Sequence, residues 1–111
     1  MMTAPPAASD TLHEAFAGCV GRMSAEMEHA WLMGDDATQV EAERLSFLSL
    51  LDATLPSGAA PGALAHRIDS KMAHASLLTI STFAEDQTRG TNARLRAQWH
   101  LRQCRNMLLD G

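Results

Sequence analysis

The residue types and spacings that could support chemistry begin with a glutamate–histidine pair in the first third of the chain. Glu26 and His29 form a Glu-x-x-His sequence, the spacing that places two ligands on one helix face in di-iron bundle proteins. Such ligands must point into the bundle. The apolar pattern around this pair instead places it about 110° from the apolar stripe, on its flank and outer side. The sequence has no second Glu-x-x-His, which the di-iron arrangement needs, so we expect a solvated pair and no bound metal.

A second grouping consists of His66 and Asp69, with His74 nearby. A histidine on a helical bundle can act in phosphotransfer, but the Lys-Gly that usually follows such a histidine is absent. Side chains three residues apart on a helix more often make a local charge-assisted contact, and we expect that contact here. No Ser/His/Asp or Cys/His grouping, phosphate-binding glycine loop or pair of carboxylates stands out. The sequence therefore predicts no enzyme activity and no cofactor.

The two cysteines, Cys19 and Cys104, match no metal-binding or redox spacing. Both fall on apolar helix faces, so we expect buried thiols that pack as small hydrophobic groups. A disulfide would suit a secreted protein. The opening residues 1–6, however, lack the basic start and apolar core of a secretory signal. These observations predict a soluble, cytoplasmic protein with reduced cysteines.

The composition indicates the fold that positions these residues. Alanine supplies 19 of the 111 residues and leucine 14, whereas valine and isoleucine together supply four and tyrosine none. Ala and Leu favour helices, while strands need β-branched and aromatic side chains. No apolar run reaches ~18 residues, so we expect no membrane insertion. The predicted fold is all-α: an antiparallel bundle of three to four helices in one domain, 9–111, after a disordered Pro/Ala-rich segment, 1–8.

Hydrophobic periodicity locates the first two helices. The first is expected from a cap at Ser9 or Asp10 to a stop at Gly34. Its solvent side is expected to carry Glu14, Gly21, Ala25 and Glu28. The second begins with a capping box over 38–41 and is apolar around more than half of its circumference. We therefore expect the second helix to be the central element of the bundle.

The C-terminal half is expected to hold a third helix from about Pro61 and a fourth segment after Gly90. A straight rod over 64–109 would be ~69 Å long, whereas the first helix reaches only ~38 Å. We therefore expect the last helix to be long, with a kink or short break near Gly90. The predicted core consists of large apolar residues from the first three helices: Phe16, Met23, Met27, Phe47, Leu48, Leu51, Leu64, Ile68 and Met72.

Charge divides the chain into two unequal halves. Residues 1–60 carry nine acidic and two basic residues, a balance of −7, whereas residues 61–111 carry four and seven, a balance of +3. One interpretation is internal complementarity between an acidic half and a basic helix. The other is a surface patch for nucleic acid or an acidic partner. Because no nucleic-acid-binding motif is present and the formal net charge is −4, we expect no nucleic-acid partner.

The last segment has apolar residues on two opposite sides, although a monomeric bundle helix needs one apolar face. Either both sides are covered within the bundle or a homodimer, or one side binds a partner helix. The spare side carries Leu95, Trp99, Arg102 and Leu109. Aromatic and arginine side chains are enriched where partners bind. We therefore expect these four residues to contact a protein client, or a second copy of the chain when no client is present.

Residues 23–55 resemble the FlgN-type flagellar export chaperones. The sequence of this stretch is MSAEMEHAWLMGDDATQVEAERLSFLSLLDATL. That family typically shows an amphipathic helix that ends in a glutamate and a Gly-Asp turn, then a charged pair before a leucine-rich stretch. Glu28, Gly34-Asp35 and Glu43-Arg44 stand in those places, followed by Leu48, Leu50 and Leu51. Beyond the loop, Leu77-Leu78 and Gly90 match the family's Leu-Leu pair and mid-helix glycine. His74 departs from the asparagine that the family often has there.

The resemblance implies a cytoplasmic chaperone without catalytic activity. Such a protein would hold the C-terminal helical segments of hook–filament junction proteins, prevent early polymerisation and pass these clients to the export machinery. Recognition would follow the helix-in-groove mode, with a client segment that folds on binding. The alternative is a small helical adaptor or homodimeric interaction module of another function.

Overall fold

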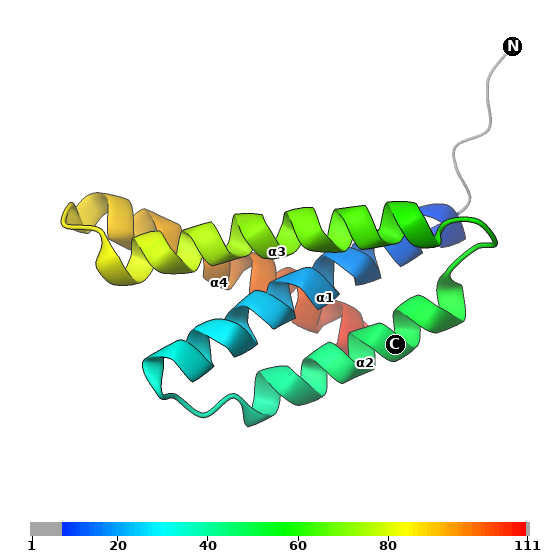
Figure 1. The fold of residues 1–111 in the computed structure, drawn as a ribbon, viewed down its shortest axis with the longest axis horizontal. Helices are drawn as coiled ribbons and strands as arrows, with labels where there is room; N and C mark the ends of the chain where they lie inside the picture. The colour runs from blue at the N-terminus through cyan, green and yellow to red at the C-terminus, as the bar shows by residue number, and fades with distance from the viewer. Residues whose placement is uncertain (1–7, 111) are drawn as a thin grey trace, which may run out of the picture.

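Four helices make up the computed structural model, which describes the chain from Ala8 to Asp110 and its side chains over 12–109 (Figure 1). They are α1 (Ala8–Met33), α2 (Thr38–Thr54), α3 (Ala60–Phe83) and α4 (Gln87–Asp110). Successive helices run in alternate directions (Figure 1). The predicted all-α helical bundle is confirmed. The predicted disordered segment lies outside the described residues except for Ala8, which belongs to α1 together with the expected cap residues Ser9 and Asp10.

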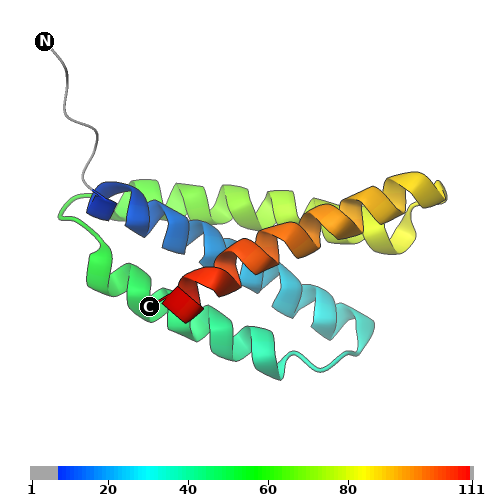
Figure 2. The same cartoon turned by 180° about the vertical axis from the view of Figure 1, so that it is seen from behind.

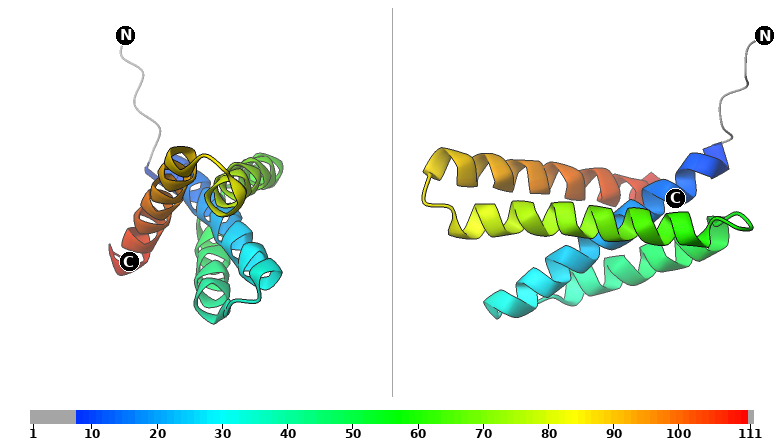
Figure 3. Two further views of the ribbon diagram at one scale, coloured as in Figure 1. Left: turned by 90° about the vertical axis from the view of Figure 1, so that its left-hand side faces the viewer. Right: turned by 45° about the horizontal axis from the view of Figure 1, so that its top comes forward.

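The centre of the bundle is α1 and not α2, so the expectation for the second helix was wrong. The backbone of α1 closely approaches those of all three other helices, most extensively that of α3, whereas the backbone of α2 closely approaches only that of α1. In the end-on view of Figure 3, α1 runs between α2 and α3. Figure 2 shows α4 crossing α1 on the opposite side of the molecule from Figure 1, and α4 packs mainly on α3. The structure is therefore a layer of α2, α1 and α3 with α4 laid across one side.

Two glycines explain why α1 occupies the centre. A Cβ atom added at Gly21 would overlap the carbonyl oxygen of Arg67 and lie 2.9 Å from the backbone nitrogen of Lys71. A Cβ atom at Gly18 would lie 3.2 Å from Nε2 of His66. The α1 and α3 backbones can approach this closely only because glycine has no side chain. Gly21 and Ala25, expected on the solvent side of the first helix, are consequently buried.

This helix crossing also decides which predicted core residues are buried. Phe16, Met23, Phe47 and Leu51 lie in the core as predicted, and Met27 and Leu48 are half-buried. The third-helix part of the prediction was wrong. The side chains that are exposed instead are those of Leu64 (53%), Ile68 (47%) and Met72 (67%). The reason is that α3 turns a different side, with the small residue Ala63 and the polar residue His74, toward the interior.

The turn after α1 follows local sequence signals, although the cap of α2 differs from the one expected. Gly34 ends α1 with a φ of 74°, the left-handed conformation that glycine adopts readily. Asp36 Oδ1 accepts hydrogen bonds from the backbone nitrogen of Thr38 at 2.9 Å and from its hydroxyl at 2.6 Å. These two bonds lower the pKa of Asp36. The expected capping box at 38–41 does not form, because α2 has no side-chain bond at its N-cap, Ala37.

The break between α3 and α4 occurs before Gly90. α3 ends at Phe83, and Asp86 precedes the first residue of α4. Asp86 Oδ1 accepts from the backbone nitrogens of Thr88 at 3.0 Å and Arg89 at 3.3 Å, which is how aspartate caps a helix. Gly90 instead lies buried within α4, where a Cβ atom would be 3.6 Å from the Ile80 and Ser81 carbonyl oxygens. The short break was therefore correctly expected, but its position was not.

Within the described residues, no helix has the length and apolarity required to span a membrane.

Candidate functional site

The four residues predicted to contact a client all lie on the solvent side of α4. Leu95 is 54% exposed, Trp99 50% and Leu109 84%, and Arg102 is also exposed. Their spacing of four, three and seven residues places them on one helix face. The opposite face is buried through Ala93, Ala97, Leu101 and Cys104. The structure therefore places the four residues on one exposed face, and their contact with a client remains a prediction.

A second apolar surface lies between α2 and α3, which the sequence did not indicate. Because both helices rest on α1 without close contact between their backbones, they leave a groove of about 250 Å³. We call it the α2–α3 groove, and it is lined by Gly21, Ser24, Met27, Glu28, Arg44, Leu64, Arg67, Ile68 and Lys71. Met72 continues the exposed apolar row of α3 one turn beyond Ile68. Two of the α3 residues predicted as core, Leu64 and Ile68, thus line an open groove.

Three of the four charged side chains that line the α2–α3 groove are held in place by hydrogen bonds or an ion pair. Arg44 Nε donates to Ser24 Oγ at 2.8 Å, and Ser24 Oγ donates to the Val20 carbonyl at 2.7 Å. Lys71 pairs with Glu28 at 2.8 Å. The lining therefore holds three cations and one carboxylate, although the whole chain carries a formal charge of −4.

His74 forms a closed polar contact in the interior. Its ring has no exposed surface. Arg22 Nη1 lies 3.1 Å from its Nδ1, and Glu26 Oε2 lies 2.7 Å from its Nε2. Because a guanidinium can only donate and a carboxylate accepts, Nδ1 is the acceptor and Nε2 carries the proton. Both ring nitrogens are thus engaged by protein groups, so His74 is not placed to exchange a proton with a substrate.

The contact with His74 corrects the expectation for Glu26, which is half-buried and not a fully solvated residue. His29, the other member of the Glu-x-x-His pair, is paired with the Thr82 hydroxyl at 3.0 Å. The expected contact between His66 and Asp69 is also absent among the described residues, since no hydrogen bond or ion pair joins them. In the part of the chain that the structure describes, no three His, Cys, Asp or Glu residues form a group suited to a metal ion.

His100 lies close to this contact and is surrounded by positive charge. Its ring packs edge-on against Trp99, with centroids 5.0 Å apart, and its centroid lies 6.4 Å from that of His74. Burial lowers the pKa of His100 to about 4, with further contributions from the positive charges of Arg22 and Arg96. Burial and the nearby Arg96 also lower the pKa of Arg22. This part of the molecule therefore holds positive charge that nearby carboxylates compensate only partly.

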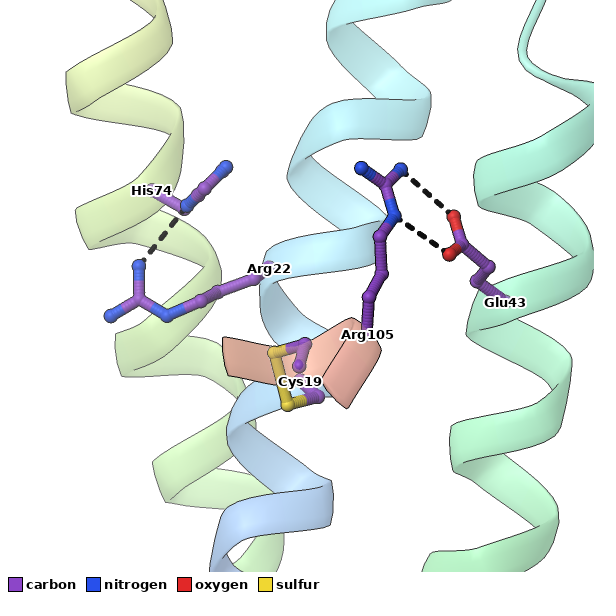
Figure 4. Close-up of a disulfide and its surroundings, with 6 residues drawn as sticks. Cys19, Arg22, Glu43, His74 and Arg105 are labelled. Carbon is purple, nitrogen blue, oxygen red and sulfur yellow. Dashed lines mark hydrogen bonds and ion pairs between the residues drawn. A yellow bond between two sulfur atoms is a disulfide. The ribbon is translucent and has the colours of Figure 1, made fainter. Parts of the chain in front are cut away.

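The two cysteines form a disulfide between α1 and α4, which corrects the expectation of buried thiols (Figure 4). The Cα atoms of Cys19 and Cys104 are 5.7 Å apart, within the usual range for this bond. Both residues lie on apolar helix faces, as the sequence indicates, but only the crossing of α1 and α4 shows that the two faces meet. The bond joins two helices that share few other backbone contacts.

Ion pairs link the acidic and basic halves of the chain, as internal complementarity predicts. Arg105 Nε and Nη2 donate to the two carboxylate oxygens of Glu43 at 2.8 and 3.0 Å (Figure 4). The bond to Glu43 raises the pKa of Arg105. Lys71 and Glu28 make the corresponding link between α3 and α1. The Glu43–Arg105 pair ties α4 to α2, two helices whose backbones make no close contact.

Comparisons with known protein families, curated proteins and solved structures find no match to this chain.

Proposed function

We propose that this protein is a non-catalytic binding protein that holds an amphipathic helical segment of a client in the α2–α3 groove. One observation carries the proposal: α2 and α3 flank α1 without close contact between their backbones, and leave Leu64, Ile68 and Met72 between 47% and 67% exposed along one row. Residues four apart on a helix form such a row, and an apolar helix face laid into a groove is a common recognition mode.

The groove favours a client helix with acidic residues beside its apolar face. Covering the exposed parts of three large apolar side chains contributes roughly 1 kcal/mol each, since full burial of such a side chain is worth about 1.5–3 kcal/mol. Arg44, Arg67 and Lys71 surround the apolar row, against the single carboxylate of Glu28. Positive groups at the edge of an interface select acidic partners and raise the association rate.

As the particular client class, we propose the C-terminal helical segments of hook–filament junction proteins, which a flagellar type III export chaperone would pass to the export machinery in the cytoplasm. The resemblance of residues 23–55 to the FlgN-type family and the all-α fold support this proposal. The exposed α4 face of Leu95, Trp99, Arg102 and Leu109 offers a second contact for the client, or for another copy of the chain.

A second candidate follows from the disulfide. Disulfides are rare in cytosolic proteins and persist in oxidising compartments. The Cys19–Cys104 bond thus favours the alternative of a small helical adaptor that works in an oxidising compartment. Trapping the thiols of intact cells with an alkylating reagent distinguishes the two. Free thiols would support the cytoplasmic chaperone, whereas protection of both cysteines until reductant is added would support the adaptor.

Binding of fluorescently labelled C-terminal segments of hook–filament junction proteins tests the proposed function. We expect Ile68→Ser to weaken binding at least tenfold and leave the fold intact, because Ile68 is half exposed in the groove. Phe83→Ser is the matched control, since Phe83 is similarly exposed on the same helix but does not line the groove.

Two results would contradict parts of the proposal. Loss of binding in Trp99→Ala but not in Ile68→Ser would transfer the client site from the groove to the α4 face. No binding by the parent protein to any of these segments would refute the flagellar client class.

A further inference from the structure

A separate cavity lies on the side of the molecule where α1, α3 and α4 meet. Its volume is about 250 Å³, room for several water molecules at about 30 Å³ each. The Cys19–Cys104 disulfide forms part of its wall. The remaining polar lining consists of groups that can donate hydrogen bonds: Arg22, His66, Ser70, His100 and Gln103. No aspartate or glutamate lines it.

Arg22 is the principal charge of this cavity. Its guanidinium is half-buried, and Nη1 donates to Nδ1 of His74 and not to a carboxylate. None of the ion pairs among the described residues includes Arg22. Glu26 accepts from the far nitrogen of His74 and also acts electrostatically on Arg105. A half-buried arginine without a directly bonded carboxylate is unusual, because burial of an uncompensated charge is costly.

The neighbouring groups add positive charge and donors. His66 Nε2 and Ser70 Oγ both lie close to Gly18. A Cβ atom added at Gly18 would be 3.2 Å from His66 Nε2 and 3.4 Å from Ser70 Oγ. Arg96 acts on both Arg22 and His100. The pKa of His100, about 4, is lowered mainly by burial and next by the charge of Arg22. His100 also lines the cavity, so the positive charge of Arg22 acts on another side chain of the cavity wall.

We propose that this cavity is a binding site for a small tetrahedral oxyanion of the phosphate or sulfate type, with Arg22 as its main contact. The guanidinium keeps one N–H on His74, which leaves the rest of its donor fork for anion oxygens. Ser70 and Gln103 supply neutral donors, and His66 supplies a ring nitrogen on the opposite helix. This site is independent of the α2–α3 groove, with which it shares no lining residue.

Calorimetry and thermal melting with inorganic phosphate, against sodium chloride at matched ionic strength, test the proposal. We expect phosphate to raise the melting temperature of the parent protein in a saturable way, and Arg22→Gln to weaken binding at least tenfold. Arg102→Gln is the matched control, because Arg102 is exposed on α4 and does not line the cavity. An equal response of both variants, or a response to phosphate no greater than to chloride, would overturn the proposal.

A second measurement does not depend on the folding of any variant. Sulfate keeps its charge throughout the pH range in which His100 titrates, so the ring can be followed by NMR with and without saturating sulfate. A bound anion favours the protonated imidazole, and we expect the titration midpoint of His100 to rise by about one pH unit, equivalent to tenfold coupling. An unchanged midpoint would show that no anion binds beside this residue.

Discussion

Reduction of the Cys19–Cys104 disulfide is expected to lower the free energy of unfolding by up to about 4.6 kcal/mol. The bond joins residues separated by 85 positions, and the chain-entropy relation for a loop of that length gives this value at 25 °C. Removal of native disulfides from small domains typically costs about 2–5 kcal/mol. Against a total stability of about 5–15 kcal/mol, this is a large effect.

The structure indicates where the loss will appear. α4 packs mainly on α3 and shares few backbone contacts with α1, so the disulfide and the Glu43–Arg105 pair hold its C-terminal half in place. Both cysteines are buried, and reduction leaves their sulfur atoms in the core without opening a cavity. The expected consequence is a less stable protein whose α4 exchanges amide hydrogens faster than α1.

Urea denaturation followed by circular dichroism, with and without reductant, measures the effect. With a slope of about 1.5 kcal/mol/M, the full effect would lower the urea midpoint by about 3 M. The control is the Cys19→Ala/Cys104→Ala double variant, which should unfold near the midpoint of the reduced protein and not respond to reductant. Equal midpoints for the oxidised and reduced parent, with reduction verified by mass spectrometry, would refute the chain-entropy reasoning.

Three further perturbations test other parts of the structure. Gly21→Ala should lower stability by about 1–3 kcal/mol in thermal melts, because its Cβ overlaps the α3 backbone, whereas Gly62→Ala, with open space around it, should not. Asp86→Ala should cost about 1 kcal/mol through loss of the α4 cap, and Glu85→Ala should cost less. His100 has a folded pKa of about 4 against 6.5 in the unfolded chain. The unfolded state therefore binds more protons between these values, and stability should fall as pH drops from 6.5 to 4. His100→Gln should remove about 1–2 kcal/mol of that fall in stability, a value that is reduced because the ring keeps some access to solvent. If the variant and the parent showed the same dependence of stability on pH, His100 would not be the cause of the fall.

The helical class and several helix ends could be predicted because their causes are local. Alanine and leucine favour helix wherever they occur, Gly34 adopts the positive φ that ends α1, and Pro61 suits the first turn of α3. The break after α3 was placed too late because Gly90 is a stronger sequence signal than the aspartate cap. Gly90 is instead buried within α4, against the α3 backbone, and Asp86 starts that helix.

The exposed face of α4 could also be read from the sequence, since Leu95, Trp99, Arg102 and Leu109 share one side of a helix whose other side is needed for the core. The α2–α3 groove could not be predicted from the sequence. Leu64, Ile68 and Met72 have the spacing of a core stripe, and spacing shows only that residues share a face, not what covers that face.

The sequence by itself determined that this chain is helical, where most of its helices begin and end, and which residues share each helix face. Those properties depend on backbone propensity and on interactions within a few residues. Only the tertiary structure decided that α1 is the central helix, that Cys19 meets Cys104, and that Glu26 bonds His74. These outcomes depend on contacts between residues far apart in sequence. They follow from the close approach of α1 and α3 at Gly18 and Gly21, which sets the rotation of α3 and leaves its apolar row in the open groove.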